Sequence, residues 1–214
     1  MRKLEEFILE KLKIKKIETN YKPKNKEELV KLIIEEIETN GPDCSLNHID
    51  VSNITDMSYL FMGGDPAKYL HGHPVLSTFD GDISNWNVSN VTDMKYMFDE
   101  CQYTGKNGDI SDWKVSKLND MDGMFADSNY NGDISNWDVS NVTNMFGVFY
   151  NSKFNGDISN WDVSNVKRFD AMFRNSKFNG DISKWQINPV AKRRMAGMFT
   201  NSPLENNPPV WYNN

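Results

Sequence analysis

The sequence predicts an α/β repeat solenoid, an elongated array of about six stacked coils. The segment DISNWDVSNV begins at Asp133 and recurs unchanged from Asp157, 24 residues later. Related copies begin at three other positions: Asp82, Asp109 and Asp181. All six tryptophans keep this register: Trp86, Trp113, Trp137, Trp161, Trp185 and Trp211. A fixed period of this length indicates a repeat array, in which each unit buries its apolar face against its neighbours.

Each repeat unit combines two patterns with different periods. The first, from Ile83 to Val88, reads I-x-x-W-x-V and is similar to the short strand of a leucine-rich repeat. The second, from Val91 to Phe98, spaces apolar residues by three and four, which predicts one or two helical turns. We therefore expect leucine-rich-repeat-like coils, each made of a strand, a turn, a short helix and a return loop.

The methionine and phenylalanine stripe of the second pattern is expected to form the hydrophobic core. It recurs as Met94-x-x-Met97-Phe98 and, 27 residues later, as Met121-x-x-Met124-Phe125. A methionine-rich surface can also bind a partner helix. Because this stripe recurs once per coil beside tryptophan and valine, packing inside the array is the favoured interpretation.

Polar residues at fixed positions are expected to satisfy the backbone of the turns. Asparagines and serines should stack into ladders that hydrogen-bond to turn backbones, at Asn90, Asn141, Asn165, Ser89, Ser116, Ser140 and Ser164. The aspartate of each Gly-Asp step should cap a turn. Calcium binding by stacked aspartates is the alternative, but calcium needs several oxygens on one ion. One aspartate per coil favours the backbone role, and no metal site is predicted.

The ends of the array are predicted to be capped. Residues 1–41 should form a helical segment, residues 42–202 the solenoid, and residues 203–214 a proline-rich closing cap. Asn25 and Glu28 resemble a capping box that opens the helix covering the first coil. A preceding helix over residues 3–17 either joins this cap or docks a partner through its lysines.

An insertion at about residues 62–80 separates a degenerate first coil from the regular array. It contains His71 and His73, two residues apart, which can share a metal ion. No cysteine or carboxylate joins them at ligand spacing, so we expect a loop tip. Because loops often carry function, the insertion remains a candidate contact surface.

Charge and motifs limit the classes of function. The net charge is −6, and the acidic excess lies after residue 40, with 14 basic and 21 acidic residues. An acidic array repels phosphate backbones, so we expect no direct nucleic-acid binding and a protein partner with a basic surface. The sequence contains no catalytic or phosphate-binding motif, and Cys44 and Cys101 fit no metal or redox spacing. We expect no enzyme activity and no cofactor.

The unit DISNWDVSNVTNMFGVFYNSKFNG resembles the BspA-like bacterial surface protein repeat, which also occurs in phages. The resemblance covers about Asp50 to Tyr212 and implies a relative of leucine-rich repeats with a surface or adhesion role. The N-terminus shows no signal peptide, lipobox or apolar run. We therefore expect no membrane association and a cytoplasmic protein, or a virion-associated one if a phage encodes it.

The leading functional hypothesis is a non-catalytic protein–protein interaction scaffold. Residues that flank a buried tryptophan on an extended segment point outward. They form a polar, mostly acidic stripe with cations near its ends. The candidate partner-binding residues are Asn85, Asn87, Asp112, Lys114, Asn136, Asp138, Asn160, Asp162, Lys184 and Gln186.

The sequence is compatible with two further functional hypotheses. A narrower version is a phage or mobile-element protein that binds and inhibits a host defence complex. An alternative of a different class is a virion structural component or cell-surface adhesin that uses the solenoid as a spacer or ligand contact. Edge-to-edge stacking of near-identical coils would also permit a homodimer.

Overall fold

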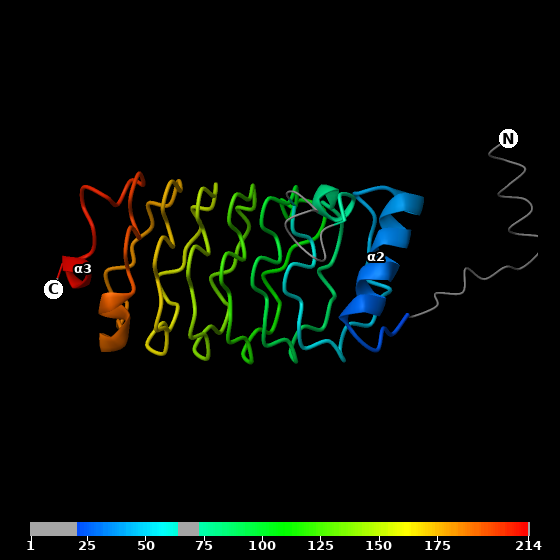
Figure 1. The fold of residues 1–214 in the computed structure, drawn as a ribbon, viewed down its shortest axis with the longest axis horizontal. Coiled ribbons are helices and arrows are strands. Elements are labelled where there is room, and N and C mark those ends of the chain that lie inside the picture. The colour runs from blue at the N-terminus through cyan, green and yellow to red at the C-terminus, as the bar shows by residue number, and fades with distance from the viewer. Residues whose placement is uncertain (1–20, 64–72, 214) are drawn as a thin grey trace, which may run out of the picture.

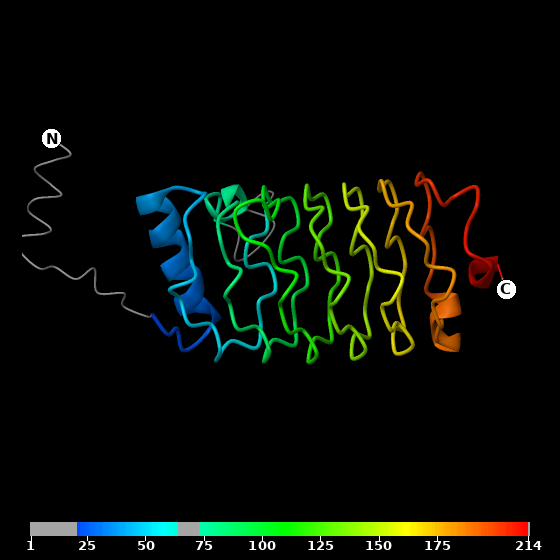
Figure 2. The ribbon, with the colours of Figure 1, turned by 180° about the vertical axis from the view of Figure 1, so that it is seen from behind.

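The computed structural model describes residues 21–63 and 73–213 as a row of stacked coils (Figure 1). The helices are α2 (Lys26–Asn40), the 3-10 helices η1 (Leu76–Thr78) and η2 (Pro189–Arg193), and the four-residue α3 (Val210–Asn213). Helix α2 lies at one end of the row and α3 at the other, as the view from behind also shows (Figure 2). The predicted helix over residues 3–17 and residues 64–72 of the insertion, His71 included, lie outside the described residues.

The tryptophans fix the register of the coils. Each indole Nε1 donates a hydrogen bond to the backbone carbonyl of the aliphatic residue that opens the preceding coil. The distance is 3.0 Å from Trp86 to Leu46 and 3.0 Å from Trp137 to Ile110. The other four indoles, of Trp113, Trp161, Trp185 and Trp211, repeat this contact at 2.8–3.2 Å. Six successive coils therefore begin at Leu46, Ile83, Ile110, Ile134, Ile158 and Ile182.

The predicted α/β solenoid of leucine-rich-repeat-like strand–turn–helix coils is wrong. The described residues contain no β-strand and no sheet, only isolated parallel bridges, and no α-helix lies within a coil. Where a strand was expected, the Trp86 amide donates to the Ile83 carbonyl at 3.1 Å and closes a turn. The three-residue spacing of isoleucine and tryptophan is thus the spacing of a β-turn.

The expected short helix is also replaced by turns. The Met97 amide donates to the Met94 carbonyl at 3.2 Å, and between them Tyr96 has a φ of +53°. A right-handed helix cannot continue through a residue in the left-handed region. The equivalent residue of every coil has positive φ: Tyr59, Tyr96, Gly123, Gly147, Ala171 and Gly197.

These turns direct alternate amides toward the next coil. The amides of Met94, Tyr96, Phe98 and Glu100 donate to carbonyls of the following coil at 2.7–3.1 Å. The same four bonds join every pair of consecutive coils, always from the earlier coil to the later one. We call this series the amide ladder. Because it satisfies the backbone without strands, the coils stack although the described residues form no β-sheet.

The predicted core is confirmed. The methionine and phenylalanine stripe is buried in all six coils. One phenylalanine per coil forms a continuous stack with ring centroids 5.5–6.0 Å apart and interplanar angles of 3–11°: Phe61, Phe98, Phe125, Phe149, Phe173 and Phe199. Burial of these large rings provides the main apolar stabilisation of a chain with 38% hydrophobic residues.

The predicted polar ladders are confirmed for the aspartates and asparagines, whereas the hydroxyls of Ser89 and Ser140 donate to side chains and not to the backbone. The aspartate that opens a coil accepts a hydrogen bond from the amide two residues later, as at Asp133 and Ser135 (2.8 Å). The same bond recurs in neighbouring coils at Asp82, Asp109, Asp157 and Asp181. The Asn141 side chain donates to the Ser116 carbonyl of the preceding coil at 2.8 Å. These aspartates therefore bind the backbone, which is the role favoured over calcium binding.

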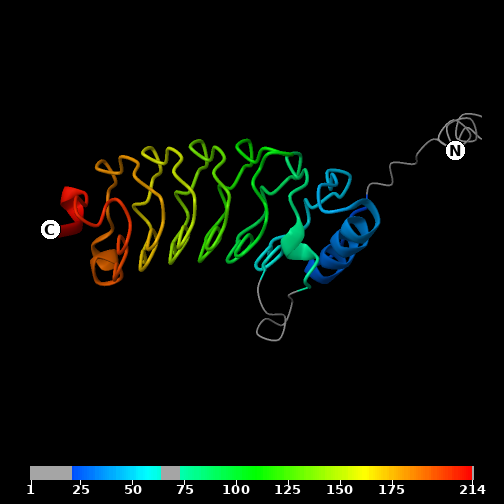
Figure 3. The same cartoon turned by 90° about the horizontal axis from the view of Figure 1, so that it is seen from above.

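Caps cover both ends of the row, as the view from above shows (Figure 3). The Asn25 side chain accepts a hydrogen bond from the Glu28 amide at 2.9 Å, which confirms the predicted start of α2. Leu29 and Ile33 are fully buried and belong to the same apolar cluster as the coils. At the other end, the Trp211 ring stacks on Trp185 with centroids 6.2 Å apart.

Candidate functional site

The ten predicted contact residues all lie at the surface. Each is exposed, and each lies next to a buried tryptophan. We call this set the tryptophan-flanking stripe, and it consists of Asn85, Asn87, Asp112, Lys114, Asn136, Asp138, Asn160, Asp162, Lys184 and Gln186. The tryptophans between them are only 3–4% exposed and are tied to the preceding coil. The backbone beneath the stripe is therefore held by buried side chains.

The stripe consists of two rows with different roles. In the row after the tryptophan, Asp138 accepts from the Ser140 hydroxyl at 2.6 Å and from its amide at 3.1 Å. Asn87 binds Ser89 in the same way, and Asp162 accepts from the Ser164 amide at 3.0 Å. The Ser164 hydroxyl and amide lower the pKa of Asp162. Asn87, Asp138 and Asp162 thus hold local turns, and the repeated N/D-x-S pattern could have indicated this role.

The side chains in the row before the tryptophan do not hold turns in this way. The side chains of Asn85, Asp112, Asn136, Asn160 and Lys184 have no hydrogen-bond partner among residues 21–63 and 73–213. Lys114, from the other row, also has none in that part of the chain, whereas Gln186 donates to the Lys184 carbonyl at 3.2 Å. The five coils that begin at Ile83, Ile110, Ile134, Ile158 and Ile182 thus each present one unengaged polar side chain in register.

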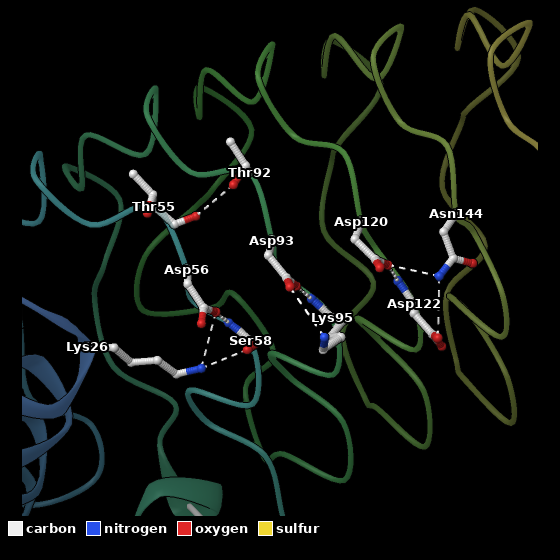
Figure 4. A network of polar contacts seen from close by, with 10 residues as sticks. All are labelled: Lys26, Thr55, Asp56, Ser58, Thr92, Asp93, Lys95, Asp120, Asp122 and Asn144. Carbon is white, nitrogen blue, oxygen red and sulfur yellow. Dashed lines mark hydrogen bonds and ion pairs between the residues drawn. The ribbon is translucent and has the colours of Figure 1, made fainter.

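A second polar face follows the amide ladder (Figure 4). Parallel bridges align Asp56, Asp93 and Asp120 in consecutive coils, followed by Asn144 and Arg168. Three stacked carboxylates repel one another, and neighbouring donors offset that repulsion. The repeat pattern did not single out this face because its residue type changes from coil to coil.

Each carboxylate of this face has its own donor (Figure 4). Lys26 Nζ lies 3.2 Å from Asp56 and 2.7 Å from the Ser58 hydroxyl. The Asn144 amide donates to Asp120 at 3.0 Å. The Lys26 contacts also attach α2 to the first coil, so this network has a structural role.

Asp122, on the same face, is less well satisfied. Its Oδ1 atom is buried and has no hydrogen-bond partner in the described part of the chain. Burial raises the pKa of Asp122, and the Asp120 carboxylate raises it further. The Tyr96 ring stacks on Tyr59 at a centroid distance of 5.5 Å. Tyr96 also covers Gly123, where an added Cβ would overlap its ring.

Asp99 has the most strongly shifted pKa among the carboxyl groups of the described residues. It is 7% exposed, and burial raises its pKa to about 7, with Asp127 and Glu100 adding to the effect. Among the residues that the structure describes, no group of three or more histidine, cysteine or acidic side chains is arranged to hold a metal ion. Burial likewise raises the pKa of the Cys101 thiol, to about 12.

Charge is distributed unevenly along the row of coils. Residues 41–156 contain 6 basic and 16 acidic side chains, whereas residues 157–214 contain 8 basic and 5 acidic ones. The first part of the array therefore has a net charge of −10 (6 minus 16) and the last part +3 (8 minus 5). The surface offers an acidic flank and a basic end.

Comparison with known families gives one match. Residues 35–128 and 102–211 match the family described as Mycoplasma protein of unknown function, DUF285. The chain belongs to this family. The two DUF285 matches overlap and together span all six coils, which identifies the chain as a repeat protein. The description does not mention the BspA-like repeat, so that finer kinship stays a proposal.

No curated protein and no solved structure matches the chain. The helices within the described ranges are too short or too polar to cross a bilayer.

Proposed function

We propose that this DUF285 protein is a non-catalytic scaffold that binds another protein through the tryptophan-flanking stripe. One observation carries the proposal. The residue before each tryptophan is exposed and has no side-chain partner in the described chain, yet its backbone is fixed by a buried, hydrogen-bonded indole. Binding to such a surface loses little conformational freedom on the scaffold side, which favours affinity.

The spacing of the tryptophan rings beneath the stripe supports an extended partner segment. Trp113 and Trp137 of neighbouring coils have ring centroids 6.2 Å apart. An extended chain repeats every two residues, at about 6.6–6.8 Å. A partner strand lying along the row can therefore place one side chain against each coil, where Asn136 and Asn160 offer amide donors and acceptors.

Charge supports a partner with a basic surface. Asp112, Asp138 and Asp162 lie within the stripe, and the coils around the first two belong to the region with a net charge of −10. Complementary charge speeds encounter and disfavours wrong partners more than it adds affinity. A nucleic acid would meet the same acidic coils with unfavourable electrostatics.

The same proposal extends to the origin of the protein. The repeated motif D-I-S-N-W-D-V-S-N-V supports a BspA-like repeat, and the acidic coils fit a cytoplasmic or virion-associated phage protein that blocks a host defence complex. Deletion of the gene should then reduce phage fitness only in a defence-proficient host. Equal fitness in both hosts would contradict this extension and leave the scaffold proposal intact.

A second candidate function is that of a spacer in a virion or a cell-surface adhesin. The uninterrupted phenylalanine stack and the amide ladder favour it, because both resist bending of the row. Fractionation separates the two functions. The spacer role requires the protein in particles or outside the cell, whereas the scaffold role requires a stoichiometric protein partner.

The scaffold proposal is tested by affinity capture of three tagged proteins from infected and uninfected host lysate. The first is the unaltered chain, and the second carries Asn136→Lys/Asn160→Lys in the stripe. The third carries Gln102→Lys/Asn179→Lys, which adds the same charge on exposed return-loop positions. Mass spectrometry then identifies the proteins recovered with each.

A stoichiometric protein that is recovered with the unaltered chain and the return-loop variant, but lost with the stripe variant, is the expected result. Equal recovery with all three chains would overturn the assignment to the stripe. Circular dichroism of the purified variants shows that any loss does not come from unfolding.

A further inference from the structure

The amide ladder ends at the last coil, where three backbone amides have no acceptor in the described part of the chain. In the fifth coil, the amides of Phe169, Ala171 and Phe173 donate to carbonyls of the sixth coil at 2.7–3.0 Å. The equivalent amides of the sixth coil belong to Met195, Gly197 and Phe199. None of these three has an acceptor among residues 21–63 and 73–213. A backbone donor without a partner must be hydrated or must receive an oxygen from another molecule.

The fourth amide of this edge shows which kind of acceptor can bind there. The Asn201 amide donates to the Glu205 side-chain oxygen at 2.9 Å. In the preceding coil, the equivalent amide, of Asn175, donates to the Thr200 carbonyl at the same distance. A carboxylate oxygen therefore stands where a seventh coil would have supplied a carbonyl.

The C-terminal cap covers only part of the edge. Helix α3 lies beside the last coil (Figure 1), where Trp211 occupies the tryptophan position and Tyr212 packs edge-on against Phe199. A groove of about 500 Å³ remains between the cap and the edge. It is lined by Lys192, Arg193, Met195, Ala196, Tyr212 and Asn213.

The charge around the groove is positive. Lys192, Arg193 and Arg194 are exposed at the turn that leads into the free donors, and no salt bridge engages them in the described chain. The edge thus combines amides at alternate residues with a cluster of cations. Both features select oxygen atoms that carry negative charge or partial negative charge.

We propose that this edge binds an extended acidic peptide segment of a partner protein. Alternate backbone carbonyls of that segment accept hydrogen bonds from Met195, Gly197 and Phe199, and its acidic side chains pair with Lys192 and Arg193. The mode corresponds to strand addition at an open edge, in which the main chain supplies affinity and side chains supply specificity. The site is separate from the tryptophan-flanking stripe and does not depend on it.

The test is a ¹⁵N–¹H NMR titration of the full-length protein with a synthetic peptide. The probe is an acetylated and amidated nonapeptide of alternating threonine and glutamate, and its control replaces each glutamate with lysine. The glutamate peptide should shift the amide signals of Met195, Gly197 and Phe199. The amides of Phe169, Ala171 and Phe173 serve as internal controls because they are already bonded, and they should stay in place.

Two variants make the test specific. Lys192→Glu/Arg193→Glu should weaken binding of the glutamate peptide by about tenfold or more, because like charges then face each other. Lys153→Glu/Lys177→Glu changes the net charge equally at exposed positions of other coils and should leave affinity unchanged.

Four outcomes would overturn the proposal. These are an absence of shifts at the three amides, equal binding of the lysine peptide, the same shifts with free glutamate at equal concentration, or equal affinity of both charge variants. The third outcome would identify a small-anion site instead. Shifts that follow protein concentration without peptide would assign the edge to a second copy of the chain. Because the stripe variant Asn136→Lys/Asn160→Lys leaves this edge intact, the two binding proposals can fail separately.

Discussion

At the scale of single residues, the tryptophans connect the coils to one another. Each donates a hydrogen bond to the coil before it, and every one except the partly buried Trp211 contributes a buried ring. The same side chain therefore supplies apolar burial, register and satisfaction of a buried carbonyl. This triple role explains why all six tryptophans keep one phase of the repeat.

Trp137→Phe should destabilise the protein by about 2–4 kcal/mol. The change removes the indole donor of the buried Ile110 carbonyl, which then accepts only from the Trp113 amide, and replaces the indole with a smaller ring. Urea unfolding followed by circular dichroism measures the loss. Val190→Ala, at a residue that is 61% exposed, is the control and should change the free energy of unfolding by less than about 0.5 kcal/mol. Equal effects of the two changes would contradict this role.

Asp99 should make stability depend on pH near neutrality. Its pKa is raised to about 7 in the folded protein by burial and by Asp127 and Glu100, whereas the ordinary value is 3.8. The folded state therefore holds a proton that the unfolded state has released, and stability falls as pH rises from about 4 to about 7. Asp99→Asn should thus be more stable than the unaltered protein at pH 8, by up to about 4 kcal/mol.

Urea unfolding between pH 5 and pH 8 measures this effect. Asp157→Asn provides the contrast, because the Ser159 amide lowers the pKa of Asp157 and favours its charged form. That variant should be less stable than the unaltered protein at pH 7. If Asp99→Asn were the less stable protein at pH 8, the burial argument would be wrong.

At the scale of elements, the coil is a sequence of tight turns with a left-handed residue in a fixed place. Glycine occupies that place in three coils, at Gly123, Gly147 and Gly197, and a non-glycine residue in the other three. A second left-handed position, present in five of the six coils, holds Glu100, Asp127, Asn151, Asn175 or Asn201. Residues other than glycine and asparagine in this region store strain, which substitution can release.

Substitutions at the first left-handed position should follow this logic. Ala171, with a φ of +54°, should gain about 1 kcal/mol of stability when replaced by glycine. Gly147→Ala should lose a similar amount, since its nearest atom, Tyr150 Cβ, is 3.7 Å away and leaves room. Gly123→Ala should lose more, because the new Cβ would overlap the Tyr96 ring. Thermal unfolding of the three variants gives the order, and a stabilised Gly123→Ala would refute it.

The sequence predicted the repeat, the core and the polar ladders because these depend on spacing alone. Side-chain spacing did not distinguish a helical turn from a β-turn, since both place residues three apart on one side of the chain. The signal that was present lies in the glycine and asparagine residues at the left-handed positions, such as Gly147 and Asn151. The direction of the amide ladder, and hence its open end, depends on backbone orientation. The pattern of residue types does not predict it.

At the scale of the whole molecule, the row of coils presents an acidic flank, a basic end and the tryptophan-flanking stripe. The exposure of all ten stripe residues followed from the tryptophan register, which was read correctly from the sequence. The division of the stripe into turn-holding residues such as Asp138 and unengaged residues such as Asn136 required the structure. We therefore assign the proposed partner binding mainly to the row before the tryptophans.

The measurement that tests the scaffold proposal most directly is a calorimetric titration of the captured partner onto purified variants. We expect Asn136→Lys/Asn160→Lys to bind the partner at least about tenfold more weakly than the unaltered chain, a difference of about 1.4 kcal/mol. Gln102→Lys/Asn179→Lys should bind as tightly as the unaltered chain. Equal affinity of all three proteins would contradict the claim that this repeat protein binds its partner through the tryptophan-flanking stripe.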